Sequence, residues 1–155
     1  KGKHIVWLEF RPVSNDYDMN DLDSTELSKI ISRTINHELV HYNQLKKQAK
    51  SKNISEEEAW EELMNDPRQL SKSGQYKDYL SLHNEIDAFA YETAEELLDK
   101  YNTQEALQML RSGSTDASRI LKDYTSFLKD DPAALQKFFK KVYTNIERIS
   151  ALGVE

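Results

Sequence analysis

The chain has 155 residues, close to the usual size of one domain and too short for two ordinary ones. Its 21 basic and 27 acidic residues give a net charge of −6, which argues against nucleic acid or an anionic membrane as a partner, because both need an excess of Lys and Arg. Cysteine is absent, which excludes disulfides, thiolate metal sites and cysteine nucleophiles. No targeting segment is visible, which favours a cytoplasmic location without fixing the compartment. Because the sequence begins at Lys1 and not Met, we also expect that an upstream segment was cut or was never included.

A short strand is predicted near the N-terminus. The run His4–Phe10 is rich in β-branched and aromatic residues, and Arg11 and Pro12 close it. The polar stretch 14–20 that follows is predicted to be a loop. Because a single strand cannot satisfy its own backbone, we expect this segment to pair with other residues.

The rest of the chain is predicted to be helical. The expected helices run from the Asp23/Glu26 capping box to about 50, from the Ser55/Glu58 capping box to about 64, and over about 76–100, 103–111, 114–129 and 132–152. The buried stripe predicted for the helix over 76–100 comprises Leu82, Ile86, Phe89, Ala90, Thr93 and Leu97. These elements predict a mainly α fold (α+β) in a single domain over residues 1–155.

Two kinds of charged segment are interpreted as solvated helix faces. The basic pairs Lys46-Lys47 and Lys140-Lys141 are small and diluted by acids. The acidic helix over 56–64 is expected to turn its carboxylates to solvent and to pack Trp60 and Leu63 inward.

One segment carries a chemical signature, the H-E-x-x-H pentapeptide from His37 to His41. Residues four apart lie one above the other on one face of a helix, so both imidazoles can bind one metal ion, for which Zn²⁺ is the expected cofactor. Glu38 lies beside that face, where it can take a proton from a water molecule on the metal. A chain of this composition contains the motif by chance about 0.01 times, so the motif predicts a catalytic zinc site.

A catalytic zinc normally has three protein ligands, and the third must lie outside the pentapeptide. The candidates are His4, His83 and a carboxylate, of which Glu85 and Asp87 lie near His83 in the segment 82–90. At about 100° per residue, Asp87 points furthest from the apolar stripe, whereas His83 and Glu85 lie on its two margins. Periodicity does not choose between His83 and Glu85.

The two motifs resemble those of zincin metallopeptidases. An H-E-x-x-H helix followed by a helix with an Asn-Glu pair is similar to the gluzincin arrangement, and the segment 85–90 is similar to one in ImmA/IrrE-type metallopeptidases. The resemblance covers roughly residues 30 to 98. It implies a minimal zincin-like core with a helical C-terminal extension from about 102, metal ligands His37, His41 and Glu85, and Glu38 as the catalytic base.

The function expected from this resemblance is hydrolysis of peptide bonds in a peptide or protein substrate. The donor that stabilises the oxyanion is open among His83 and the tyrosines near the motifs, which are Tyr42, Tyr76, Tyr79 and Tyr91. Two alternatives remain: a catalytically silent, zincin-like binding or regulatory protein, and a zinc amidase that acts on a non-protein substrate. An intact Glu38 favours an enzyme, because a scaffold has no use for a general base there.

Overall fold

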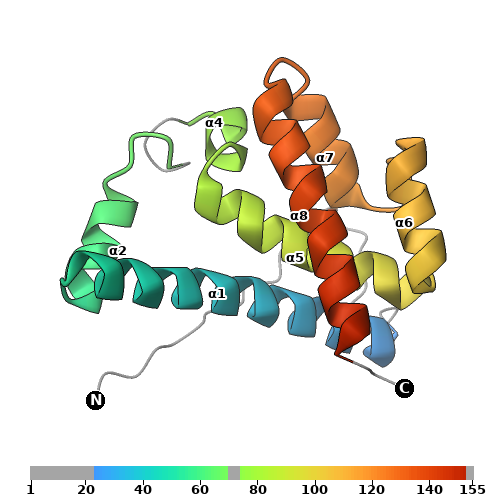
Figure 1. Cartoon of the computed structure of the whole chain (residues 1–155), viewed down its shortest axis with the longest axis horizontal. Coiled ribbons are helices and arrows are strands. Elements are labelled where there is room, and N and C mark those ends of the chain that lie inside the picture. The colour runs from blue at the N-terminus through green and yellow to red at the C-terminus, as the bar shows by residue number, and fades with distance from the viewer. Residues whose placement is uncertain (1–22, 70–73, 153–155) are drawn as a thin grey trace.

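The computed structural model describes residues 23–69 and 74–152, and every regular element in these ranges is a helix (Figure 1). The helices are α1 (Ser24–Lys52), α2 (Glu56–Met64), α4 (Tyr76–Leu80), α5 (His83–Lys100), α6 (Thr103–Ser112), α7 (Arg119–Phe127) and α8 (Pro132–Ala151). The mainly α prediction is therefore confirmed for this part of the chain. The strand expected at His4–Phe10 lies outside the described residues.

Helix α1 is the long base of the molecule, and α2 folds back beside its C-terminal end (Figure 1). Asp23 caps α1 by accepting a bond from the Thr25 amide. The capping box of Ser55 and Glu58 begins α2 as predicted, with both reciprocal bonds present. A small core of Leu45, Ala49 and Ala59 joins the two helices. Trp60 was expected to pack inward but is 50% exposed, because Ala59 occupies the face that α2 turns to α1.

The main core lies around α5, which contacts α1 and every described helix of the C-terminal half. Helix α8 packs along α5, and its Phe138 stacks on Tyr124 of α7 with ring centroids 3.7 Å apart. Phe138, Tyr124 and Leu97 of α5 are fully buried in this cluster. The segment after residue 102 thus shares one core with α5, and it starts its last helix with Asp131 and Pro132, as predicted.

Two expected helices are shorter in the structure. The continuous helix predicted over 76–100 is broken into α4 and α5, because Leu82 adopts an extended backbone (ψ 137°) and acts as the N-cap of α5. The helix expected over 114–129 begins only at Arg119, since the Ser118 hydroxyl caps it by accepting from the Leu121 amide. The break at Leu82 matters for the site, because it places Glu85 in the first turn of α5.

The interface between α1 and α5 is built largely from polar pairs. The two helices run antiparallel, and the contacts run in order along them: Arg33 with Asp99, Asn36 with Glu95, His37 with Glu92 and Gln44 with Asp87. In contrast, Ile30, Ile35 and Leu39 of α1 are exposed. Helix α1 therefore packs on α5 through its polar face. Over the described ranges, no helix is both long and apolar enough to cross a bilayer.

Candidate metal centre

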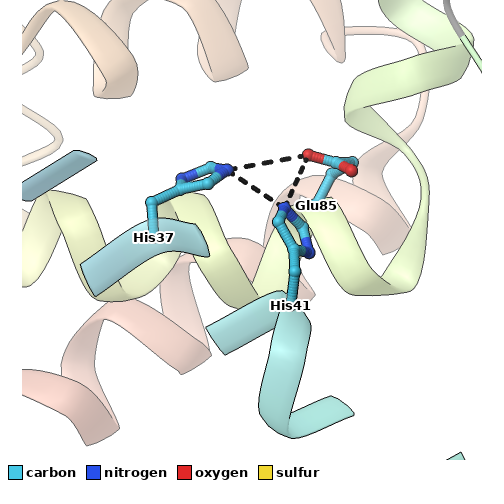
Figure 2. A group of neighbouring side chains, drawn as sticks. All are labelled: His37, His41 and Glu85. Carbon is cyan, nitrogen blue, oxygen red and sulfur yellow. Dashed lines mark hydrogen bonds and ion pairs between the residues drawn. The ribbon is translucent and has the colours of Figure 1, made fainter. Parts of the chain in front are cut away.

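Three side chains meet where α1 crosses the start of α5. The Nε2 atoms of His37 and His41 are 3.1 Å apart. Oε2 of Glu85 lies 3.9 Å from the His37 nitrogen and 3.5 Å from the His41 nitrogen. Figure 2 shows the two rings rising from one helix and pointing at the carboxylate that comes from the other. The structure thus brings together the three residues that the resemblance implied as metal ligands.

Local sequence explains how these side chains come to face one another. His37 and His41 are one helical turn apart on α1, so their side chains lie on the same face. Glu85 occupies the first turn of α5, where a carboxylate is also favoured by the partial positive charge of the helix N-terminus. His37 is 7% and Glu85 is 4% exposed, so these two residues shield their side of the centre from solvent.

A second carboxylate orients His37. Oε2 of Glu92 lies 3.0 Å from Nδ1 of His37, and the ring packs edge-on against Phe89 with centroids 4.5 Å apart. The carboxylate accepts the Nδ1 proton, which leaves the Nε2 lone pair directed at the centre. A carboxylate behind a histidine is the usual support of a metal ligand, because it fixes the tautomer and makes the ring more basic.

Gln44 orients His41 in the same way as Glu92 orients His37. Its Oε1 lies 3.3 Å from Nδ1 of His41, and its Nε2 donates to Oδ2 of Asp87 at 3.2 Å and to the carbonyl of Asn84 at 3.4 Å. Since both acceptors on α5 require the amide nitrogen on their side, the amide oxygen has to face His41. His41 then donates from Nδ1 and, like His37, presents a lone pair at Nε2.

The electrostatics of the centre are those of a site for a cation. Burial acts to lower the pKa of His41, but the hydrogen bond and charge of Glu85, with smaller contributions from Glu38 and Gln44, raise that pKa above 6.5. Oε2 of Glu85 is buried and accepts no hydrogen bond of ordinary geometry, and the nearby Nε2 of His41 lies 3.5 Å from it. Two lone pairs and an anionic oxygen that face one another within 4 Å favour a positively charged occupant.

The spacing of the three donor atoms fits zinc. A tetrahedral ion with bonds of about 2.0–2.1 Å holds its ligand atoms about 3.3 Å apart. The three measured separations are 3.1, 3.5 and 3.9 Å, so the donors surround such an ion with only small movements. Two imidazoles and one carboxylate are also a ligand set of catalytic zinc, which leaves a fourth position for water or substrate.

Glu38 and Tyr79 lie next to this centre. Glu38 is exposed, and its charge acts on both His41 and Tyr79. Burial, followed by the charge and hydrogen bonding of Glu85, raises the pKa of Tyr79 well above 10. Tyr79 therefore stays protonated at neutral pH and remains able to donate a hydrogen bond.

The other described candidates contact groups other than the three converging donors. The His83 side chain is 67% exposed and turns to Asp87, with Nδ1 3.7 Å from Oδ1. Tyr91 lies under the guanidinium of Arg148, and Tyr42 under the ammonium of Lys46. Tyr76 stacks on Tyr79, 6.1 Å between centroids. His4 lies outside the described residues.

Two residues of the centre, Glu92 and Gln44, were not predicted from the sequence. Glu92 follows Glu85 by seven residues, two turns of the same helix, and Gln44 follows His41 by three. Both spacings place the side chain on the face of the neighbouring ligand, so helical periodicity was the signal that could have found them.

Comparison with known proteins adds no relative: no protein-family model, no curated protein and no solved structure matches this chain. Two oriented imidazoles and a buried carboxylate can hold a divalent cation, and Glu38 and Tyr79 add an exposed carboxylate and a protonated phenol beside it.

Proposed function

We propose that the protein is a zinc-dependent metallopeptidase. The observation that carries the proposal is the convergence of His37, His41 and Glu85, with their donor atoms within 4.8 Å of one another. A binding site for metal alone would need only these three. The H-E-x-x-H spacing adds Glu38, whose exposed carboxylate lies on the helix turn between the two imidazoles, and this is the residue that turns a metal site into a hydrolytic one.

Each residue of the site has a different role in the proposed hydrolysis of a peptide bond. A zinc ion bound at this centre would supply a Lewis acid that polarises the peptide carbonyl and lowers the pKa of the attacking water. Glu38 takes the proton of that water as it attacks, and then delivers the proton to the nitrogen of the departing amine. Glu92 and Gln44 keep the two rings aligned throughout.

Tyr79 is our candidate for the group that stabilises the oxyanion. Its phenol lies beside Glu85 and is kept protonated by burial and by that carboxylate. A neutral phenol next to the metal can donate a hydrogen bond to the oxygen on which negative charge develops. Tyr76 also feels the charge of Glu85, but Tyr79 shares a hydrogen bond with this carboxylate in addition.

Metal analysis and a single conservative variant test the proposal. We expect about one zinc per chain in the purified protein and cleavage within a pooled library of synthetic peptides, followed by mass spectrometry. Glu38→Gln keeps the size of the side chain but removes the base, so it should bind zinc normally and lose hydrolysis. Loss of metal from this variant would instead give Glu38 a structural role.

A matched pair of substitutions tests the third ligand. Glu85→Ala should weaken zinc binding by more than the 10–100-fold that removal of a supporting residue costs. His83→Ala, two residues earlier and exposed, should leave it unchanged. The reverse pattern would remove Glu85 from the centre. Zinc bound at full stoichiometry without cleavage of any peptide would favour a binding or regulatory protein over a peptidase.

A further inference from the structure

A polar groove runs between α1, α5 and α8 on another side of the molecule. Its volume is about 620 Å³. Helices α1 and α8 form its walls and both pack on α5, which forms its floor with Asp87 and Tyr91. At about 100° per residue, the lining positions 36, 40, 43 and 47 of α1 face roughly opposite to Glu38. The groove therefore opens away from Glu38, and it borders the metal centre through Gln44, which also contacts His41.

The groove is positively charged in an acidic protein. Three cationic side chains line it, Lys47, Lys141 and Arg148, against the single carboxylate of Asp87. Asp87 engages one of them, with Nζ of Lys141 3.1 Å from its Oδ1. Within the described part of the chain, Lys47 makes no hydrogen bond or ion pair. Since the whole chain carries a net charge of −6, this local excess of cations is a specific feature of the groove and favours an anionic ligand.

The remaining polar groups are suited to a peptide backbone. Asn43 and Asn145 line opposite walls, and neither side chain makes a hydrogen bond to the described residues. Each amide can donate and accept at once, as a backbone amide requires. The aromatic ring in the groove is not free for a nucleotide base, because the Arg148 guanidinium covers Tyr91 at 5.4 Å from the ring centroid. A peptide therefore fits better than a nucleotide.

We propose that this groove binds an acidic peptide segment in polyproline II conformation. Lys141 and Arg148 are seven residues apart on α8, which corresponds to about 10.5 Å along the helix axis. A polyproline II chain has three residues per turn and rises about 3.1 Å per residue, so two carboxylates three residues apart lie on one side of the peptide, about 9.3 Å apart, and reach both cations. The groove then holds a partner or a remote part of a substrate, while the side of Glu38 stays open. The proposal does not depend on the metal.

Binding of two matched peptides tests the groove. The probe is acetyl-Gly-Asp-Ala-Ala-Asp-Gly-amide, and its control carries Asn in place of both Asp residues; dissociation constants are measured by isothermal titration calorimetry at low ionic strength. We expect the Asp peptide to bind at least 10-fold more tightly. Lys141→Ala and Arg148→Ala should each weaken it about 5- to 10-fold, since each removes a charge-assisted hydrogen bond.

Two further variants keep the test decisive. Lys140→Ala removes the neighbouring, exposed lysine, which points about 100° away from Lys141, and should change nothing. Lys47→Ala removes a cation without a partner among the described residues, so it should weaken the peptide about 3- to 5-fold without disturbing a native ion pair. Equal affinity for the two peptides, equal effects of Lys140→Ala and Lys141→Ala, or binding of inorganic triphosphate but not of the Asp peptide would each overturn the proposal.

The His37→Ala/His41→Ala double variant separates this proposal from the peptidase. It lacks two of the three proposed zinc ligands but keeps the whole lining of the groove. We expect it to bind the Asp peptide as the unaltered protein does. Loss of binding in this variant, with its circular dichroism spectrum unchanged, would refute a groove that binds the peptide independently of the metal centre.

Discussion

Removal of the Glu92 carboxylate is the sharpest test of how the metal centre is supported. Oε2 of Glu92 accepts a hydrogen bond from Nδ1 of the candidate ligand His37, and the two atoms are 3.0 Å apart. It does not lie among the three converging donors, so its loss changes the orientation and basicity of His37 without removing a ligand. Glu92→Ala removes the acceptor, whereas Glu92→Gln keeps an oxygen acceptor and removes only the charge.

The size of the effect follows from the geometry. Loss of a partner that orients a metal ligand typically costs 10–100-fold in metal affinity. The Glu92 side chain is 22% exposed, so solvent screens part of its charge, and we expect the low end, about 10-fold, for Glu92→Ala. A tenfold change is about 1.4 kcal/mol. A neutral hydrogen bond is about half as strong as a charged one, so Glu92→Gln should cost about 0.7 kcal/mol, or about 3-fold.

Competition with a chromophoric zinc chelator at fixed pH gives the three dissociation constants. Glu57→Ala is the control for a general loss of negative charge, because Glu57 is exposed on α2, and it should bind zinc like the unaltered protein. An affinity of Glu92→Ala for zinc within twofold of the unaltered protein, or an equal loss of affinity in Glu57→Ala, would refute the orienting role of Glu92.

Three further predictions concern catalysis and stability. Tyr79→Phe should bind zinc normally but lower kcat about 100-fold in the peptide assay, the usual cost of losing one oxyanion donor; an unchanged kcat would exclude Tyr79 from this role. Burial raises the pKa of Glu95 above 4.5, so the folded form binds its proton more tightly and stability falls as pH rises from 4.5 through the raised pKa. Because Oε2 of Glu95 is also buried without a donor, Glu95→Gln should raise the free energy of unfolding at pH 7 by about 1 kcal/mol in urea titrations, with little gain below pH 4.5. Phe138→Ala empties a fully buried site stacked on Tyr124 and should cost about 3–5 kcal/mol in the same titrations; a loss under 1 kcal/mol would contradict this core assignment.

The features that could be predicted from sequence are those fixed by neighbouring residues. The capping box of Ser55 and Glu58 starts α2 because both of its bonds lie within four residues. Asp131 and Pro132 start α8 for the same reason. The break before α5 was missed, because nothing in the local pattern requires the extended backbone of Leu82.

The choice of the third metal ligand needed tertiary information. His83 and Glu85 both lie beside the apolar stripe of α5, and periodicity treats them alike. What separates them is how α5 is rotated against α1, and that rotation is set by contacts between residues more than 40 apart, such as Gln44 with Asp87. The apolar side chains of α1 were equally misleading, since Ile35 and Leu39 are exposed and the helix packs through polar residues instead.

The polar character of the α1–α5 interface has a mechanical consequence. Among the described helices, α1 contacts only α5 and α2. The pair formed by α1 and α2 therefore packs on the other described helices only through the interface between α1 and α5. Polar pairs hold helices together weakly compared with an apolar core. His37 and His41 lie on α1 and Glu85 lies on α5, so an ion bound to all three would link the two helices across their interface. Removal of the ion by a chelator would then weaken this interface as well as abolish the proposed hydrolysis.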